Sequence, residues 1–93
     1  MEKYQPLNGY RNEEGKFDRL PGKRQKKKLD LMIAYLAEQF EKGRKYTEKE
    51  VNAILNQHHS FNDPATLRRL LFGMGIMQRT IDGRSYWLVG NRN

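Results

Sequence analysis

The hydrophobic positions of the chain form three stripes with helical spacing, followed by a region of short apolar runs. The first stripe occupies positions i, i+3, i+4, i+7 and i+11, which is one face of an α-helix, and it predicts a helix over residues 23–40. Its members are Leu29, Met32, Ile33, Leu36 and Phe40. Gly43 follows as a natural stop. We expect this stripe to pack into the core.

A second helix begins with the clearest capping signal in the sequence. Thr47 is suited to the N-cap position, and Glu50 three residues later completes a capping box. Tyr46 and Val51 occupy the two positions of a hydrophobic staple. The expected buried stripe is Val51, Ile54 and Leu55. The helix is predicted to end near Asn56.

A third helix is predicted from Asp63-Pro64, which places an acid at the N-cap and a proline at the first helical position. The expected buried stripe is Leu67, Leu70, Leu71 and Met74. Gly73 and Gly75 mark the end of the helix. The opposite side then carries Ala65, Arg69 and Phe72, with Thr66 and Arg68 on the flanks.

Two short strands are predicted after these helices, over residues 76–81 and 84–89. The dipeptide Asp82-Gly83 between them is typical of a two-residue hairpin loop. That loop pairs Ile81 with Arg84 and Arg79 with Tyr86, and places Trp87 on the other face, where we expect it to join the core. A residue pair near Tyr46 is expected to add a short first strand.

The ends of the chain differ from this middle part. Residues 1–22 are predicted to be an N-terminal arm or short hairpin, with a turn at 12–15 and a short strand at 16–20. Residues 91–93 are expected to fray. The predicted fold of residues 23–90 is α+β: a winged helix-turn-helix with three helices followed by a two-stranded β-hairpin wing.

The charge of the chain is concentrated in one short segment. The formal net charge is +7. Residues 16–28 contain seven basic residues against the single acid Asp18, so they carry six of the excess positive charges. Such a block is the usual electrostatic footprint of nucleic-acid binding, although it can also be a solvated helix start. Lysines at a helix N-terminus oppose the helix dipole, which favours a functional role for them.

Several functions find no support in the composition. Without cysteine the chain has no disulfide and none of the usual structural zinc sites. The adjacent histidines His58 and His59 cannot form a helical i, i+4 metal pair, so we expect loop histidines and no metal. No nucleophile–base pair can be nominated, so neither an enzyme nor a cofactor is expected. No segment is long and apolar enough for a membrane span, and a cytoplasmic location is expected.

Four motifs resemble a bacterial family defined as a domain of unknown function. They are the basic run Leu20-Pro-Gly-Lys-Arg-Gln-Lys-Lys-Lys28, the segment Tyr46-Thr-Glu-Lys-Glu-Val-Asn52, the segment Ala65-Thr-Leu-Arg-Arg69 and the hairpin Asp82-Gly-Arg-Ser-Tyr-Trp87. The resemblance covers residues 12–89. It implies a winged-helix domain that stands alone or follows a second helix-turn-helix domain, in proteins described as transcriptional regulators. The loop His58–Asp63 is longer than the family's His-x-Asp link, so the second and third helices are expected to approach differently.

The candidate nucleic-acid contacts fall into three groups. In winged helices that bind DNA, the third helix enters the major groove and the wing follows the backbone or minor groove. The phosphate contacts of the basic block are Lys23, Arg24, Lys26, Lys27 and Lys28. The third-helix contacts are Thr66, Arg68 and Arg69, and those of the wing are Arg79 and Arg84. For Arg68 and Arg69 the alternative is pairing with carboxylates such as Glu50 or Asp63.

Phe72 is a candidate partner interface because it points away from the predicted core. Three explanations are open for Phe72: the N-terminal arm covers it, a partner protein or second copy covers it, or it stacks on a base. The apolar residues of the arm favour coverage by the arm. We expect a DNA-binding transcriptional regulator. The alternatives are a protein that binds structured RNA or the ribosome, and a protein-interaction or dimerisation module that meets an acidic partner through the basic block.

Overall fold

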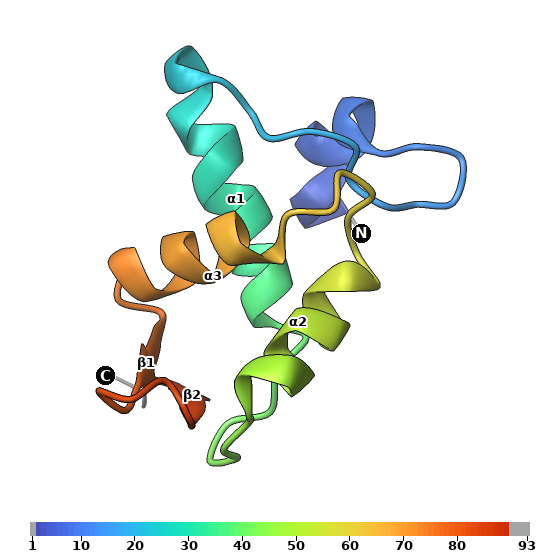
Figure 1. Cartoon of the computed structure of the whole chain (residues 1–93). Helices are drawn as coiled ribbons and strands as arrows, with labels where there is room; N and C mark the ends of the chain where they lie inside the picture. The colour runs from blue at the N-terminus through green and yellow to red at the C-terminus, as the bar shows by residue number, and fades with distance from the viewer. Residues whose placement is uncertain (1, 90–93) are drawn as a thin grey trace.

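The structure, a computed structural model, describes residues 2–89 and is a mixed α+β arrangement (Figure 1). The expected tail at 91–93 and residue 90 lie outside the described residues. The elements, in chain order, are the 3₁₀ helices η1 (Glu2–Tyr10) and η2 (Lys23–Gln25), the α-helices α1 (Lys26–Ala37), α2 (Glu48–Asn56) and α3 (Pro64–Gly73), and the strands β1 (Met77–Arg79) and β2 (Tyr86–Leu88).

The first predicted helix is shorter than its hydrophobic stripe. Residues 23–25 form the 3₁₀ turn η2, and α1 starts only after Gln25, whose backbone is not helical (φ −115°, ψ 46°). At the other end, the N–H of Phe40 donates to the carbonyl of Ala37 at 3.2 Å, so the chain tightens into a turn. Phe40 is nevertheless buried with the rest of the stripe, while Leu29 is only half-buried.

The boundaries of α2 and α3 are confirmed. Thr47 caps α2 and forms the reciprocal capping box with Glu50, and Asp63 caps α3 directly before Pro64. The prediction for Met74 is wrong. Met74 is the C-cap residue of α3, beyond the last helical turn, and its side chain is 37% exposed instead of buried.

The hairpin has the predicted register but a different loop. Arg79 pairs with Tyr86, as expected. The expected two-residue loop is wrong, because the N–H of Thr80 donates to the carbonyl of Ser85 and encloses the four residues 81–84. Only Gly83 in this loop has a positive φ (74°), whereas a type I′ turn needs a positive φ at both central residues. Ile81 is therefore unpaired and fully exposed.

The expected short first strand is confirmed as a single bridge, in which the backbone of Tyr46 pairs antiparallel with that of Tyr86. On the other face of the hairpin, Trp87 is only half-buried and lies outside the buried cluster. The expectation that Trp87 joins the core is wrong, because the opposite face of the hairpin, with Met77 and Tyr86, is the one that is buried in the core.

The N-terminal arm begins as a 3₁₀ helix that packs on α1, on the side of the molecule away from the hairpin (Figure 1). Leu7 is fully buried, and the ring of Tyr4 meets that of Tyr35 edge-on with 5.0 Å between centroids. The predicted turn at 12–15 is confirmed, but the strand at 16–20 reduces to Phe17 alone. The arm does not cover Phe72, because its apolar side chains are used on α1.

A buried histidine links α2 to α3. The Nε2 atom of His59 accepts a hydrogen bond from the N–H of Asp63 at 2.9 Å, so Nδ1 carries the proton and donates to the carbonyl of Leu55 at 2.8 Å. The arm contacts the loop between α2 and α3. The carbonyl of Phe17 accepts a hydrogen bond from the N–H of Ser60, and the N–H of Phe17 donates to the carbonyl of His58, both at 2.8 Å. This loop is therefore ordered by contacts from three segments.

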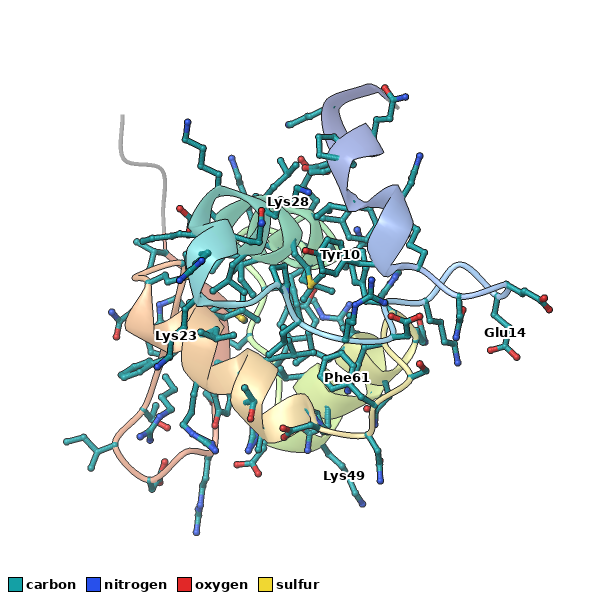
Figure 2. All side chains as sticks on the ribbon, turned by 90° about the horizontal axis from the view of Figure 1, so that it is seen from above. Tyr10, Glu14, Lys23, Lys28, Lys49 and Phe61 are labelled. Atoms are coloured by element: carbon teal, nitrogen blue, oxygen red, sulfur yellow. The ribbon has the colours of Figure 1, made fainter. Side chains whose placement is uncertain are left out.

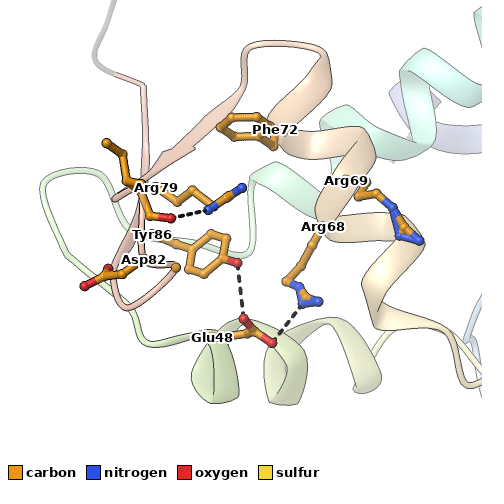
Figure 3. A pocket seen from close by; sticks show the side chains of 9 residues that line it. Glu48, Arg68, Arg69, Phe72, Arg79, Asp82 and Tyr86 are labelled. Carbon is orange, nitrogen blue, oxygen red and sulfur yellow. Dashed lines mark hydrogen bonds and ion pairs between the residues drawn. The ribbon is translucent and has the colours of Figure 1, made fainter.

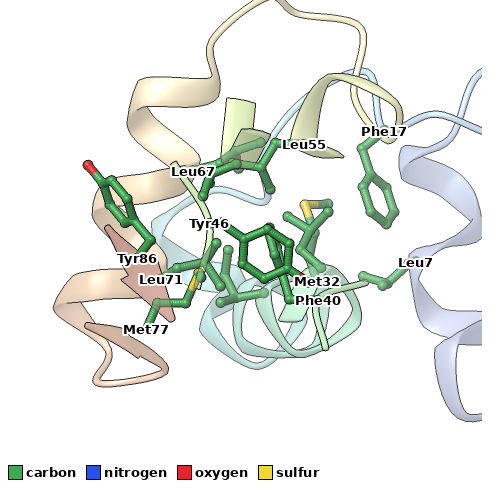
Figure 4. Close-up of a cluster of buried hydrophobic side chains, with 13 residues drawn as sticks. Leu7, Phe17, Met32, Phe40, Tyr46, Leu55, Leu67, Leu71, Met77 and Tyr86 are labelled. Carbon is green, nitrogen blue, oxygen red and sulfur yellow. The ribbon is translucent and has the colours of Figure 1, made fainter. Parts of the chain in front are cut away.

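One hydrophobic cluster connects η1, the three α-helices and the two strands (Figure 4). It consists of Leu7, Phe17, Met32, Ile33, Leu36, Phe40, Tyr46, Val51, Leu55, Leu67, Leu71, Met77 and Tyr86. Because Leu7 and Phe17 belong to it, the arm is part of the folded domain. No helix among residues 2–89 is long and apolar enough to cross a membrane.

Candidate functional site

An open cleft lies between α3, the first turn of α2 and the β1–β2 loop (Figure 3). Its volume is about 560 Å³. The lining residues are Glu48, Arg68, Arg69, Phe72, Arg79, Ile81, Asp82, Gly83 and Tyr86. The cleft therefore brings together two predicted contacts from the third helix, one from the hairpin, and the exposed phenylalanine.

Arg79 and Phe72 form one wall of this cleft. The guanidinium carbon of Arg79 lies 5.1 Å from the centroid of the Phe72 ring, and Phe72 remains 40% exposed. Nη1 of Arg79 also donates to the carbonyls of Thr80 and Ile81, at 3.2 and 3.3 Å. These bonds hold the guanidinium group over the ring, so the pair presents an ordered cationic and aromatic surface.

Arg68 and Arg69 have different roles although they are adjacent in sequence. The side chain of Arg68 is only 18% exposed, and its Nη1 pairs with Oε2 of Glu48 at 3.4 Å and Oδ1 of Asn52 at 3.3 Å. Glu48 Oε1 in turn accepts from the hydroxyl of Tyr86 at 3.4 Å. Arg68 therefore connects α3 to α2 and, through Glu48, to the hairpin.

Arg69 is exposed and has no hydrogen-bond or ion-pair partner among residues 2–89. Two hydrogen bonds from Thr66, first that of its hydroxyl and then that of its N–H, hold the pKa of Asp63 below its usual value, and the positive charge of Arg69 adds to them. Those bonds, 2.7 Å from the hydroxyl and 3.1 Å from the N–H, occupy Thr66 in the helix cap. Of the three predicted third-helix contacts, only Arg69 is free to meet a ligand.

Arg84 lies on the loop at the outer end of the hairpin. Its side chain is 86% exposed and its Nε is 3.5 Å from Oδ2 of Asp82. Asp82 also accepts from the hydroxyl of Thr80 at 2.6 Å and from the N–H of Arg84 at 3.0 Å. These bonds lower the pKa of Asp82 and order the loop.

The basic block is divided by the fold. Lys23 and Lys26 border an apolar groove of about 370 Å³, which Leu29, Leu70 and Met74 also line, at the C-terminal end of α3. Lys26 pairs with Asp30 at 3.2 Å. The remaining predicted phosphate contacts of the block are Arg24, Lys27 and Lys28. Arg24 and Lys27 are exposed, whereas Lys28 lies beside Tyr10 of the arm, with Nζ 5.8 Å from the ring centroid (Figure 2).

The residues that complete the cleft were missed by sequence reasoning. Glu48 is explained in the sequence by its place in the first turn of a helix, where acids are favoured. Its pairing with Arg68 joins segments twenty residues apart, for which the sequence carries no spacing signal. Ile81 was expected to pair in the hairpin, and its position in the cleft follows from the longer loop. Among residues 2–89 no group of three or more His, Cys, Asp or Glu residues could hold a metal ion.

Comparison with known proteins gives one match. The profile of the family DUF2087, described as an uncharacterized protein conserved in bacteria, matches residues 16–88. No curated protein and no solved structure matches the chain.

Proposed function

The chain belongs to the DUF2087 family of bacterial proteins, and we propose that in this member the α3–hairpin cleft is part of a nucleic-acid-binding surface on a winged-helix domain. DNA is the first choice of polymer and transcriptional regulation the expected context. The alternative polymer is structured RNA, free or in the ribosome.

The order of the elements supports the winged-helix assignment. A helix, a one-residue strand at Tyr46, two further helices and a hairpin follow one another in the order of that fold, with α2 and α3 as the helix-turn-helix pair. The hairpin corresponds to the wing. On this assignment α3 is the helix that enters the major groove.

The observation that carries the proposal is the pair of arginines on opposite sides of the cleft. Arg69 extends from α3 without a protein partner, and Arg79 extends from the hairpin (Figure 3). Arginines suit both bidentate guanine contacts and phosphates. Arg84 extends the positive surface along the loop. Lys23 and Lys26 lie at a separate groove beside Leu70 and Met74, and would form a second positive surface.

Two predicted contacts change role within this proposal. Arg68 and Thr66 are occupied inside the protein, so they position α3 instead of contacting nucleic acid. Lys28, beside Tyr10, is expected to contribute less than Lys23.

Fluorescence anisotropy tests the proposal. The protein is titrated into a labelled random DNA duplex and a labelled structured RNA at two salt concentrations. We expect log affinity to fall with log salt at a slope near −0.9 for each phosphate neutralised on a duplex. Changing Lys26, Lys27 and Lys28 together to Glu is expected to weaken binding to every nucleic-acid sequence alike. Binding that does not depend on salt, or no binding at low salt, contradicts the proposal.

A second set of variants separates base contacts from phosphate contacts. If α3 enters the groove, Arg69→Ala relaxes sequence preference, with a loss of about 1–3 kcal/mol for the preferred site. The matched control is Lys16→Ala, which removes one charge from the N-terminal arm, away from the hairpin (Figure 1). We expect the control to retain the preference.

A protein-interaction module is the second candidate function, and the apolar groove at the end of α3 favours it. Met74 is 37% exposed beside Leu29 and Leu70, and Lys23 and Lys26 stand at the rim. A partner that presents apolar side chains next to carboxylates fits this groove. Sedimentation at several concentrations, with Met74→Glu and Phe72→Ala variants, tests for self-association. If the unchanged protein and both variants are monomers at every concentration and nucleic-acid binding is intact, the protein is not a dimerisation module.

A further inference from the structure

Phe72, beside Arg79, is 40% exposed and is not part of the hydrophobic cluster. Resting on the nucleic-acid function proposed above, we propose that the cleft binds one unpaired nucleobase, stacked on this pair. The preferred nucleic acid is then one with a bulge, a loop or a single strand, in preference to an uninterrupted duplex.

The first argument is the chemistry of the wall. Phe72 is 40% exposed, and the Arg79 guanidinium, 5.1 Å from its ring centroid, is fixed by two carbonyls of the loop. Aromatic rings and guanidinium planes are the two protein groups on which unpaired bases stack. A preordered pair of this kind loses little side-chain entropy when a base binds.

The second argument is the shape of the cleft. Its volume of about 560 Å³ falls in the range of small-ligand sites. Ile81, fully exposed on the loop, lines the same cleft. A flat, largely apolar group therefore finds apolar surface on both α3 and the loop.

The third argument is the distribution of charge, which favours a base over a phosphate inside the cleft. Glu48 and Asp82 also line it, and each carboxylate is already paired with an arginine of the protein, Glu48 with Arg68 and Asp82 with Arg84. Arg68 is neutralised by Glu48, whereas Arg69 is unpaired. A neutral base inside the cleft, with its phosphate at Arg69, avoids the carboxylates and uses the free arginine.

In an uninterrupted duplex the faces of the bases are covered by their neighbours, so none can stack on Phe72 without first leaving the helix. An unpaired nucleotide avoids most of this cost. Stacking of one base on an aromatic side chain corresponds to about a 5- to 150-fold change in affinity. We therefore expect tighter binding of the interrupted nucleic acid by a factor in this range.

The test uses two labelled duplexes, each made as DNA and as RNA. One is uninterrupted, and the other has the same sequence with a single 2-aminopurine nucleotide inserted as a bulge. Anisotropy gives the affinities, and 2-aminopurine fluorescence reports stacking of the base. For the unchanged protein we expect at least about 5-fold tighter binding of one bulged duplex and a saturable fluorescence change. Free 2-aminopurine nucleoside monophosphate is titrated in parallel.

The variants are Phe72→Leu, which keeps an apolar side chain without an aromatic face, and Phe72→Tyr, which keeps the ring. Met74→Leu is the matched control, because Met74 is an exposed apolar residue at the same end of α3 but outside the cleft. Phe72→Leu is expected to lose the preference for the bulge and the fluorescence change, whereas Phe72→Tyr and Met74→Leu keep both.

The outcomes separate this inference from the function on which it rests. Equal affinities for bulged and uninterrupted duplexes, unchanged in Phe72→Leu, overturn the stacking inference but leave nucleic-acid binding in place. A response to the free nucleotide alone overturns it in favour of a small-molecule site. If neither duplex binds in either polymer, the nucleic-acid function fails as well.

Discussion

The backbones of Tyr46 and Tyr86 exchange both hydrogen bonds, each N–H donating to the other's carbonyl at 2.8 Å. This single bridge attaches the hairpin to the segment before α2. The Tyr86 side chain then reaches Glu48, and Glu48 reaches Arg68. The hairpin is thereby fixed against α2 and α3, and this attachment keeps the Phe72–Arg79 wall and Arg69 at one cleft.

The hydroxyl of Tyr46 is expected to stabilise this bridge. It accepts the N–H of Glu41 at 2.7 Å, and the ring is buried edge-on to Phe40, with 5.2 Å between centroids. Tyr46→Phe leaves the Glu41 N–H without its acceptor and is expected to cost about 1 kcal/mol of the free energy of unfolding. Urea unfolding followed by the fluorescence of Trp87, the only tryptophan, measures it.

Tyr10→Phe is the control, since the Tyr10 hydroxyl makes no hydrogen bond within residues 2–89. Equal midpoints for the Tyr46→Phe variant and the unchanged protein would contradict a role for this bond.

Local signals predicted those parts of the fold whose stabilising contacts are themselves local. The ends of α2 and α3 follow from Thr47 and Asp63, whose side chains cap helices within three residues. The hairpin loop did not follow, because Asp82-Gly83 fits both a two-residue loop and the four-residue loop that the Thr80 side chain closes. The docking of η1 on α1 joins distant segments, and no periodicity in either segment encodes it.

The arm is expected to contribute directly to stability. Leu7 is fully buried in the main cluster. Leu7→Ala leaves a cavity and is expected to cost about 2–5 kcal/mol. The matched control is Ile81→Ala, because Ile81 is fully exposed, and it should change stability by less than about 0.5 kcal/mol. Urea or thermal unfolding of both variants checks this, and equal losses would show that the arm does not pack as described.

The Arg68–Glu48 ion pair is expected to stabilise the protein and not to bind ligand. A double-mutant cycle with Glu48→Ala and Arg68→Met isolates the pair from other effects. Because Arg68 is mostly buried and Glu48 is half-exposed, we expect a coupling energy of about 0.5–1 kcal/mol that decreases with salt. Additive losses of stability would mean that the two side chains do not interact.

The sequence predicted several residues of the candidate site, but it did not predict which of them are free and which are held inside the protein. Arg69, Arg79 and Phe72 were all selected from the sequence, Arg69 and Phe72 by their helical positions and Arg79 by its charge and its place in the predicted hairpin. The difference between Arg68 and Arg69 was not, because helical spacing places both near the exposed side, and only the approach of α2 brings Glu48 and Asn52 to Arg68.

His58 is expected to make stability depend on pH near neutrality. Burial of its ring, and then the charges of Arg11 and Lys16, lower its pKa below the ordinary value of 6.5. As the pH falls through 6.5, the unfolded chain therefore binds a proton that the folded protein does not. Stability is fully present above 6.5 and decreases as the pH falls from there toward the folded pKa.

His58→Gln removes the titrating imidazole and should flatten the pH dependence of stability below pH 6.5. The lowered pKa values of Asp63, Asp82 and Glu38 act at lower pH, and they are common to both proteins. The difference in urea midpoint between the variant and the unchanged protein at pH 7.5, 6.5 and 5.5 therefore reports the contribution of His58 alone. Parallel curves would mean that His58 titrates normally, and that its ring is not enclosed by Arg11, Lys16 and Tyr35 as the fold requires.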